Sequence, residues 1–336
     1  MTIEPKVLQF NDCAFVARSM VSAAAQAGLS WDYLPPELVR PMTAAPRNPL
    51  LAKARFVPYL LRRRAALQAA EVVHVHYGTS ARLLAERGMP TRPYVLTLHG
   101  TDIRKQWVDP IFHDEIQRAV DGAEHVYFAN IDTAENAKAA RSDAEFLPAL
   151  VDAGALPAWE PASEPTIVFV SRWDDDKGVE TQLEFARKLR AAVAPSIRIL
   201  GLNWGPGAAS AGAAGVELMD KMPQAEFHRL VAASHFTVGQ ATNNFATSEF
   251  EALCMGAPMA AVGQRLPRPD DGTLPPVLHG GIEDVVEQLV LALADPQATA
   301  ERLGGAAWAL PRYDAASYVP GLAKLYGDIA RQGRRA

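Results

Sequence analysis

The stretch TIVFVSRWDDDKGVE, residues 166–180, decides the fold of this chain. It opens with an unbroken run of β-branched and aromatic residues, Ile167–Val170, which is typical of a buried strand. After it, apolar residues recur at helical spacing, at Val179, Leu183, Phe185, Ala186 and Leu189. A strand, a turn and a helix in this order predict the first half of a βαβ unit.

Two cations, Arg172 and Lys177, lie five positions apart in the turn, where the following helix also begins. Their charges and the free N–H groups of the helix start would converge on one anion, which suits a diphosphate. The alternative is a solvated, charged loop that binds nothing. This stretch alone leaves both interpretations open.

The composition is that of an ordinary soluble globular protein, with 49% hydrophobic and 21% charged residues. At 336 residues the chain exceeds the usual size of one core, so two domains are expected. The net charge of −5 argues against a dedicated nucleic-acid binder. Cys13 and Cys254 are too few and too distant for a disulfide framework or a zinc site. Without a secretory pattern in residues 1–6 or a bilayer-spanning apolar run, we expect a cytoplasmic protein.

The first half of the chain alternates between strands and helices. Expected strands are Val7–Phe10, Trp31–Leu34, Val72–His76, Tyr94–Leu98 and His125–Ala129. Expected helices are Phe15–Ala27, Leu50–Ala70, Ser80–Arg87, Ile111–Val120 and Thr133–Ala140. Such alternation implies a parallel sheet that is covered by helices on both faces.

A second round of alternation follows a Pro-, Ala- and Gly-containing linker between Pro148 and Pro165. Its expected strands are Ile167–Val170, Ile197–Leu200, Val216–Leu218, Phe236–Val238 and Met259–Val262, with helices between them, at Glu283–Leu293 and at about Ala315–Arg331. Residues 201–215 are expected to be irregular, and no Lys-Ser/Thr follows them to make a phosphate loop. The pattern predicts two α/β domains with a ligand in the cleft between them, at the C-terminal ends of the strands.

A candidate helix start lies within residues 240–258. Ser248 is followed three residues later by Glu251, which is the spacing of a capping box, and capping is the interpretation that this pattern favours. The alternative is that the helix start presents N–H groups to a phosphate while Glu251 accepts a hydrogen bond from a ribose.

Three histidines fall on neighbouring predicted strands. His99 directly follows the strand that ends at Leu98, so it is placed to face the cleft and bind a polar ligand; a structural role is the alternative. His74 and His76 share one face of their strand. No third ligand accompanies them, so we expect no metal site there.

The trio Asp174, Asp175 and Asp176 resembles the acidic metal sites of sugar transferases. Lys177 follows it directly, and a divalent cation shared with substrate phosphates would not bind beside a cation. We expect a solvated turn there and no metal.

The predicted helix around Arg55–Arg64 combines four arginines with apolar residues. A basic amphipathic helix can lie on an anionic membrane surface, which would place the protein peripherally at the inner membrane face. The alternative is that the arginines form a solvated helix face.

In this order, these segments resemble the retaining glycosyltransferases of family 4. The resemblance spans nearly the whole chain. It rests on His99–Asp102, on Phe146–Asp152, on Arg172 with Lys177 and Gly178, and on Glu251–Leu253 before Gly256–Pro258. The tail, Tyr318–Ile329, resembles the closing helix of that family, which crosses back toward the first domain.

The resemblance implies the GT-B fold, with two Rossmann-like domains whose parallel sheets face an interdomain cleft. Residues 1–155 would form the acceptor-side domain, 156–312 the nucleotide-sugar-binding domain and 313–336 the crossing helix. It also implies a metal-independent, hexosyltransferase-like enzyme without a cofactor. The substrates would be a nucleotide-diphosphate sugar and a hydroxyl acceptor, which could be a glycan, a lipid-linked intermediate or a small metabolite.

The resemblance also implies roles for single residues. Arg172 and Lys177 would bind the diphosphate and stabilise the leaving group, because charge develops there in the transition state. His99 would contact the donor sugar near the anomeric centre, Glu251 would bind the ribose, and the backbone near Met222 would meet the base. The remaining donor-binding positions would be Asn243, Asn244, Phe245, Ala246 and Thr247, and the acceptor-side positions Asn11, Asp12, Asp102 and the Pro-rich loop Pro35–Pro49.

Two positions depart from the pattern of the family. Asn243 stands where the family has a glutamate, and Asn11–Ala14 replaces a glycine pair that would let backbone approach a ligand closely. These departures motivate an alternative function, a non-catalytic GT-B-like protein that binds a nucleotide sugar or regulates a partner. A GT-B epimerase is less expected, because no acid/base pair of carboxylate and histidine stands out beyond the transferase pattern.

Overall fold

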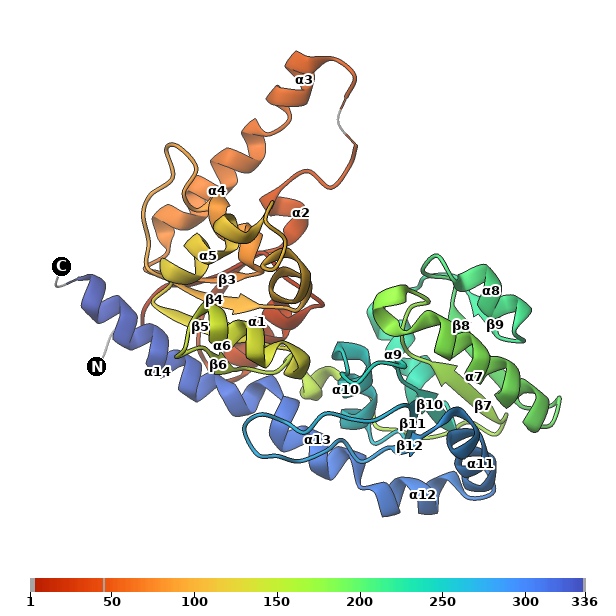
Figure 1. The fold of residues 1–336 in the computed structure, drawn as a ribbon. Coiled ribbons are helices and arrows are strands. Elements are labelled where there is room, and N and C mark those ends of the chain that lie inside the picture. The colour runs from red at the N-terminus through yellow and green to blue at the C-terminus, as the bar shows by residue number, and fades with distance from the viewer. Residues whose placement is uncertain (1–3, 45, 335–336) are drawn as a thin grey trace. The chain divides into compact units, whose positions relative to one another are not determined.

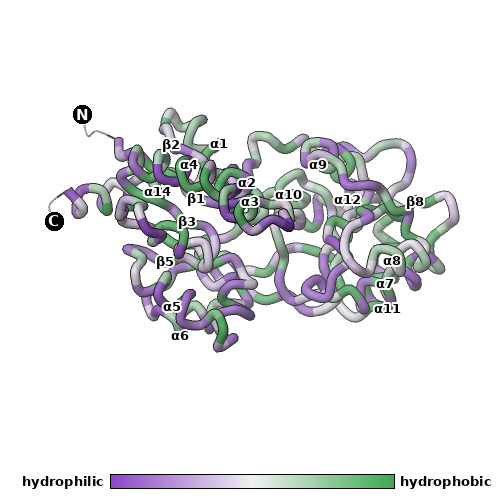
Figure 2. The backbone as a smooth tube through the Cα atoms, turned by 90° about the horizontal axis from the view of Figure 1, so that it is seen from above, coloured by the Kyte–Doolittle hydropathy of each residue, from purple (hydrophilic) through white to green (hydrophobic). Residues whose placement is uncertain are grey.

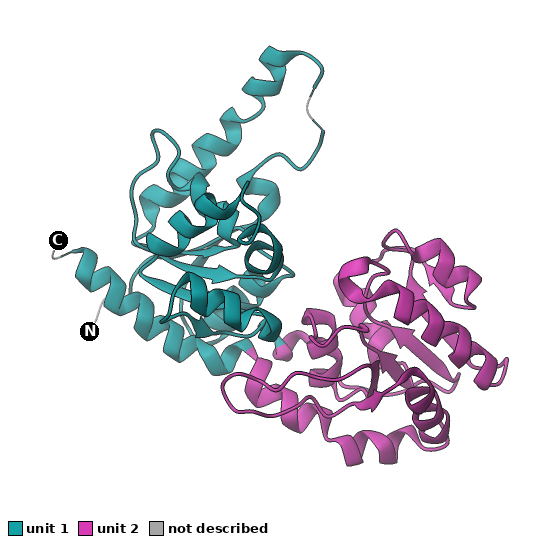
Figure 3. Cartoon of the chain, viewed as in Figure 1, with its two compact units in different colours: residues 1–152, 315–336 teal, residues 153–314 magenta. Residues whose placement is uncertain are grey.

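The computed structural model describes residues 4–44 and 46–334, which fold into two compact units (Figure 3). The first unit contains the described residues up to Asp152 together with those from Ala315 onward. The second unit is Ala153–Asp314. Each unit has its own sheet and its own core.

The first unit is built on a parallel sheet of six strands in the order β2-β1-β3-β4-β5-β6 (Figure 1). The strands are β1 (Val7–Phe10), β2 (Trp31–Leu34), β3 (Val72–His76), β4 (Tyr94–Leu98), β5 (His125–Phe128) and β6 (Glu145–Phe146). The chain leaves β1 toward β2 on one side and later returns to β3 on the other, so the strand order reverses between β1 and β3. Ligands of such folds bind where the order reverses, at the carboxyl ends of the strands.

The second unit repeats this plan with the order β12-β11-β10-β7-β8-β9. Its strands are β7 (Thr166–Phe169), β8 (Arg198–Leu202), β9 (Glu217–Met219), β10 (Phe236–Val238), β11 (Met259–Val262) and β12 (Leu278–Gly280). All of its strand pairs are parallel, and the order reverses between β7 and β10. The fold prediction of two α/β units with parallel sheets is therefore confirmed.

Helices flank both sheets. Those of the first unit are α1 (Val16–Gln26), α2 (Pro36–Val39), α3 (Pro49–Ala54), α4 (Val57–Ala69), α5 (His113–Asp121), α6 (Ala134–Ala140) and α14 (Ala315–Gly333), with the shorter turns η1 (Gly78–Leu83), η2 (Asp102–Gln106) and η3 (Ile131–Thr133). Those of the second unit are α7 (Val179–Ala192), α8 (Ala208–Ala213), α9 (Gln224–Ala232), α10 (Thr247–Met255), α11 (Ile282–Ala292), α12 (Pro296–Leu303) and α13 (Gly305–Tyr313), with η4 (Ala153–Ala155) and η5 (Asp175–Lys177).

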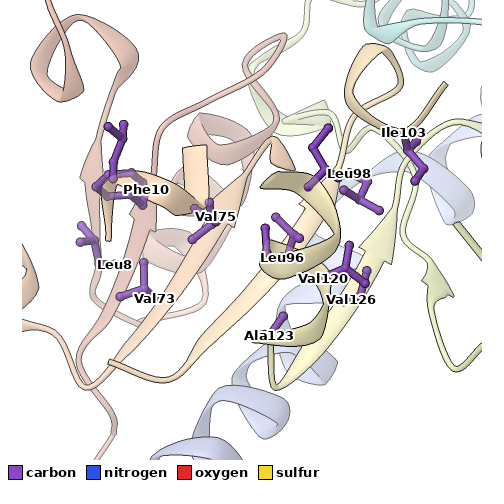
Figure 4. Packing of buried hydrophobic residues seen from close by; sticks show 14 of the residues in the cluster. Leu8, Phe10, Val73, Val75, Leu96, Leu98, Ile103, Val120, Ala123 and Val126 are labelled. Carbon is purple, nitrogen blue, oxygen red and sulfur yellow. The ribbon is translucent and has the colours of Figure 1, made fainter. Parts of the chain in front are cut away.

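The first sheet is buried on both faces, which is why its strands carry continuous apolar runs. On one face, strand residues such as Leu8, Val73 and Leu96 lie in one buried cluster that also contains Val120 of α5 (Figure 4). On the other face, a second cluster joins the strands to α1 and to the C-terminal helix α14, whose Tyr326 is fully buried. The last helix of the chain is thus part of the core of the first unit.

Several predicted elements need correction. The single helix expected at Leu50–Ala70 is divided into α3 and α4, because Pro58 has no N–H to donate to Ala54 and continue the first helix. The helix expected at Ser80–Arg87 is the short 3-10 helix η1. Part of the irregular stretch 201–215 is the helix α8. The sequence pattern also missed β12, α12 and α13.

The predicted linker is partly core. Ala149, Leu150 and Val151, close to its start, are buried, and Ala149 and Leu150 pack in the cluster that contains α14. The backbone N–H of Ala315 donates to the carbonyl of Val151, which ties the start of α14 to this segment. The prolines around these residues gave the stretch the composition of an exposed linker, although Leu150 and Val151 are buried.

The segment α3–α4 projects away from the sheet of the first unit (Figure 1). Hydrophobic and hydrophilic stretches follow one another along the backbone (Figure 2), and within α3–α4 apolar residues stand beside arginines and a lysine. The exposed large apolar residues of this segment include Leu50, Leu51, Phe56, Val57 and Leu61. No helix within the described residues is both long enough and apolar enough to cross a membrane.

Candidate functional site

In the second unit, the loops after β7 and β10 meet where the strand order reverses. The N–H of Ala241 donates to the carbonyl of Lys177 at 3.0 Å. Gly178 has a φ of +72°, and a Cβ on it would lie 2.7 Å from the carbonyl oxygen of Ala241. Only a glycine lets the two loops approach this closely.

Arg172 and Lys177 both belong to the loop after β7. Nε of Arg172 donates to Oδ2 of Asp174 at 3.3 Å, and Oδ1 of Asp174 accepts from the N–H of Asp176 at 3.2 Å. The aspartates lie at η5, the turn before α7, and Asp174 caps it while holding the guanidinium of Arg172. This loop therefore places two cations next to the start of α7.

Trp204 is a neighbour of these cations that the sequence pattern did not single out. Its ring centroid lies 5.8 Å from Cζ of Arg172 and 4.0 Å from Nζ of Lys221, and 43% of the residue is exposed. The carbonyl of Trp204 accepts from the N–H of Trp173 at 2.9 Å, and the N–H of Gly207 donates to the carbonyl of Trp173 at 3.0 Å. The start of the stretch 201–215, which was expected to be irregular, is therefore hydrogen-bonded to the loop that carries Arg172 and Lys177.

The predicted capping box at α10 is wrong. The N-cap of α10 is Ala246, and the carboxylate of Glu249 accepts from the N–H groups of Ala246 and Gln240, both at 3.0 Å. Ser248 lies inside the helix. Because alanine has no side-chain oxygen, the local sequence carries no capping-box pattern at this start.

Glu251 is consequently not a capping residue. Its Oε1 accepts from Nε2 of Gln224 at 2.9 Å, and its Oε2 lies 3.2 Å from Nε2 of His228. The residue is only 8% exposed. Both partners belong to α9, and Gln224 follows Met222 by two residues, so Glu251 and the segment of Met222 are brought together.

The residues of the loop before α10 differ in exposure. Asn243 is exposed, and its carbonyl accepts from the N–H of Leu266 at 3.2 Å. Asn244, Phe245 and Thr247 are buried, and Ala246 is partly buried. Among these positions, only the side chain of Asn243 is largely open to solvent.

Arg265 lies beneath this loop and was not predicted. Its guanidinium carbon is 5.0 Å from the ring centroid of Phe245, and its Nη2 donates to the carbonyl of Val262 at 2.5 Å. The residue is 7% exposed, and burial lowers its pKa to about 10. No short-range pattern marks an arginine that is buried by a loop twenty residues earlier in the chain.

In the first unit, the loop after β4 is held by Asp102. This carboxylate is fully buried and accepts from the N–H groups of His99, Gly78 and Ile103 at 2.9 to 3.2 Å. Burial raises the pKa of Asp102, and these hydrogen bonds oppose the rise. Gly100 has a φ of +113°, and a Cβ on it would clash with the side-chain amide of Asn130. The His-Gly-Thr-Asp segment therefore fixes the backbone of His99.

The side chain of His99 is partly buried and contacts β3. Its Nε2 lies 3.0 Å from Nδ1 of His76, and the rings of His76 and His74 are stacked at 4.5 Å. Burial, together with the nearby His76, lowers the pKa of His99 to about 3. Burial likewise lowers the pKa of His76 to about 3. His99 is therefore neutral at physiological pH.

The loop after β1 adopts the backbone shape that glycines would favour, although it contains none. Asn11, Ala14 and Phe15 have φ values of 64°, 53° and 64°. Nδ2 of Asn11 donates to the carbonyl of His76 at 3.0 Å, which ties the loop to β3. Such left-handed conformations in residues with a Cβ store strain, and strain of this kind gathers at functional sites.

Asp12 in the same loop has two roles. Its carboxylate accepts from the N–H of Ala17 at 3.0 Å, at the start of α1, and from the hydroxyl of Tyr33 at 2.8 Å. It also lines a pocket of about 380 Å³ with Ala14, Phe15, Arg18, Tyr33, Pro36 and Glu37. The pocket joins the loop after β1 to the start of the Pro-rich segment, the two places where the acceptor was expected.

Comparison with solved structures identifies the fold. The chain is similar to a sucrose-phosphate synthase from Thermosynechococcus elongatus, with a TM-score of 0.68 at 16% identity over 97% of this chain and 100% of that one. It is similar to HepE of Anabaena in complex with UDP-glucose, with a TM-score of 0.64 at 13% identity over 96% and 100% of the chains. A putative UDP-N-acetylglucosamine 2-epimerase from Listeria monocytogenes gives 0.60 at 13% identity over 99% and 98%.

No protein-family model matches the sequence, and no curated protein sequence does. At these identities the structural likeness establishes the fold alone. With its two parallel six-stranded sheets and flanking helices, the chain has the GT-B fold.

Proposed function

We propose that this protein transfers a glycosyl group from a nucleotide-diphosphate sugar to a hydroxyl acceptor. The observation that carries the proposal is the loop pair of the second unit, where Arg172 and Lys177 precede α7 beside the loop before α10. Cations and a helix start at a strand-order reversal suit a diphosphate. Solved structures of the same fold include HepE with UDP and glucose and TarM with UDP, which supports a nucleotide-sugar donor.

The donor roles follow from the contacts on the second unit. Arg172 and Lys177 hold the diphosphate, and Asp174 keeps the guanidinium of Arg172 in place. Glu251, which is not occupied by capping, accepts from the ribose while Gln224 orients it. The backbone near Met222 meets the base. The positions Asn243, Asn244, Phe245, Ala246 and Thr247 complete the donor-binding loop.

The chemistry needs little beyond these groups. The bond between the anomeric carbon and the oxygen of the β-phosphate breaks, its electron pair leaves on that oxygen with the nucleoside diphosphate, and the acceptor oxygen bonds to the anomeric carbon. The leaving phosphate takes the proton of the acceptor hydroxyl, so attack occurs on the face it leaves and the configuration is retained. The two cations stabilise the charge on phosphate without a metal ion, each contributing about 3 kcal/mol in the transition state.

The acceptor side belongs to the first unit. The pocket that Asp12 lines offers a carboxylate, the hydroxyl of Tyr33 and the exposed ring of Phe15. These groups suit a polyol or a glycan, whose hydroxyls donate to carboxylates while its ring packs on an aromatic face. His99 contacts the donor sugar, with Asn11 and Asp102 acting through the loops that they hold.

We also propose that the α3–α4 segment rests on the inner face of an anionic membrane. Residues 38–70 carry seven arginines and lysines and no acidic residue, in a chain whose net charge is −5; Arg63 is buried and paired with Glu86, which leaves six for a surface. Exposed Leu50, Leu51 and Phe56 lie among these cations. Each cation near an anionic surface contributes about 1 kcal/mol of attraction. Co-sedimentation with vesicles of phosphatidylglycerol should exceed that with neutral vesicles, and equal binding would contradict the proposal.

A second candidate function is that of a non-catalytic protein that binds a nucleotide sugar without turnover or regulates a partner enzyme. Asn243 favours it, since the position is exposed and carries no charge where the related enzymes have a glutamate. The GT-B epimerase among the structural neighbours makes a third reaction class testable in the same assay.

The test is a screen of nucleotide sugars with hydroxyl acceptors, in which release of the nucleoside diphosphate and the sugar product are both measured. Transfer with an unchanged anomeric configuration, insensitive to EDTA, is expected. Tight binding without any product would favour the binding protein, and an isomerised nucleotide sugar the epimerase. An inverted product would overturn the retaining mechanism.

A further inference from the structure

A series of buried hydrogen bonds connects His99 to the C-terminal helix α14 within the first unit. His99 Nε2 meets His76 Nδ1 at 3.0 Å, and His76 Nε2 meets the side-chain oxygen of Gln9 at 2.9 Å. The side-chain nitrogen of Gln9 donates to the hydroxyl of Tyr326 at 3.3 Å. Gln9, His76 and Tyr326 are all fully buried, so no water competes for these bonds.

The series of hydrogen bonds continues from Tyr326 to a second histidine, His74. The hydroxyl of Tyr326 lies 2.6 Å from Nδ1 of His74, and Nε2 of His74 lies 2.6 Å from Oγ1 of Thr97. Every ring nitrogen of His74 and His76 is thereby used. Burial lowers the pKa of both histidines, so each is neutral and has one donor and one acceptor nitrogen.

Because each neutral imidazole must donate once and accept once, the direction of one bond sets the direction of all. The oxygen of Gln9 faces His76, so His76 carries its proton on Nε2 and accepts at Nδ1. His99 must then donate from Nε2, which leaves its Nδ1 without a proton. Reversing any one bond would require reversing all of them, including the amide of Gln9.

The bond between Gln9 and Tyr326 supports this direction. If all donor and acceptor roles were reversed, the hydroxyl of Tyr326 would donate to the oxygen of Gln9. Hydrogen bonds of the O–H···O type are about 2.5 to 3.0 Å long. The separation of 3.3 Å is closer to the range of an N–H donor. With the oxygen of Gln9 toward His76, the hydroxyl of Tyr326 accepts from Gln9 and can donate to His74, where the separation is 2.6 Å.

We propose that Gln9 and His76 are positioning residues that hold His99 in the Nε2–H tautomer, so that Nδ1 presents a lone pair to the ligand. Among the described residues, none pairs with Nδ1 of His99. The ligand group that meets His99 is then a hydrogen-bond donor, such as a sugar hydroxyl. A carboxylate or carbonyl at that place would face a lone pair without a proton between them.

This inference rests on the proposed role of His99 toward a sugar, but its test needs neither a donor nor turnover. Nitrogen NMR of histidine-labelled full-length protein distinguishes protonated from unprotonated ring nitrogens. The expected spectrum assigns His99 and His76 as neutral, with Nε2 protonated in His99 and in His76. A proton on Nδ1 of His99 would overturn the proposal, whatever the enzyme assay gives.

Two variants separate positioning from packing. Gln9→Met keeps the volume of the side chain but removes both hydrogen bonds of its amide group. The NMR signal of Nε2–H in His99 is then expected to weaken, because His99 would populate both tautomers. Tyr326→Phe removes a partner of both Gln9 and His74 but keeps the oxygen of Gln9 that accepts from His76, so it is expected to change His74 and to weaken the His99 signature less than Gln9→Met does. A His99 signature that Gln9→Met does not alter would show that another group sets the tautomer. The unmodified protein decides the main question even if a variant fails to fold.

Discussion

At the scale of single residues, the loop after β1 takes left-handed conformations without glycine. Ala14, with a φ of 53°, is the clearest case, because its side chain makes none of the polar contacts that can stabilise asparagine in this region. This strain costs the folded protein about 1 kcal/mol. A glycine at position 14 would relieve it, but glycine also gives the unfolded chain more entropy, which cancels part of the gain. We expect Ala14→Gly to raise the free energy of unfolding by about 0.5 kcal/mol in urea denaturation. Ala25→Gly, at an exposed helical position of α1, should lower it by about 1 kcal/mol, and a loss with Ala14→Gly would contradict the strain.

Some residues of the candidate site could be predicted from the sequence and others could not. Arg172 and Lys177 could be placed, because the strand, turn and helix around them are local in sequence. The capping role that the local pattern favoured for Glu251 was wrong, because the carboxylate at this helix start is that of Glu249, which acts on Ala246, a residue that no pattern marks as an N-cap. Partners such as Gln9 and Tyr326 are 317 residues apart, so no local spacing could pair them.

At the scale of elements, the start of α10 depends on a carboxylate rather than a hydroxyl. Glu249 satisfies two backbone N–H groups, whereas Ser248 satisfies none. Glu249→Gln keeps the shape but weakens both bonds, and should cost about 1 to 2 kcal/mol of unfolding free energy in chemical denaturation. Ser248→Ala is the matched control and should cost less than about 0.5 kcal/mol. A larger loss of unfolding free energy in Ser248→Ala than in Glu249→Gln would instead support the capping box that the sequence suggested.

The order of elements was largely predictable, whereas their ends and some of their identities were not. Continuous apolar runs located the central strands because both faces of each parallel sheet are buried. The break between α3 and α4 depends on Pro58, which the apolar spacing alone did not reveal as a boundary. The short strand β12 carries too few apolar residues to stand out.

At the scale of the whole molecule, the buried histidines make stability depend on pH. The pKa of His76 is about 3 in the folded protein, below its ordinary value of 6.5, so the unfolded chain binds the proton first as pH falls. Stability is therefore lost as pH falls below 6.5, by about 1.4 kcal/mol per pH unit for each such histidine. Between pH 6.5 and 5, His76→Gln should show a shallower fall in unfolding free energy than the unmodified protein. His279→Gln, at an exposed histidine, should not, and equal slopes in all three proteins would refute the effect.

In the proposed function Arg172 and Lys177 bind the diphosphate of a nucleotide sugar, and calorimetric titration with nucleoside diphosphates tests this binding most directly. The unmodified protein should bind at least one of them. Arg172→Ala and Lys177→Ala should each weaken that binding 10- to 100-fold, or about 1.4 to 2.7 kcal/mol. Arg187→Ala removes the same charge from an exposed position on α7 and should leave the affinity unchanged. Equal affinities for all four proteins would contradict the account.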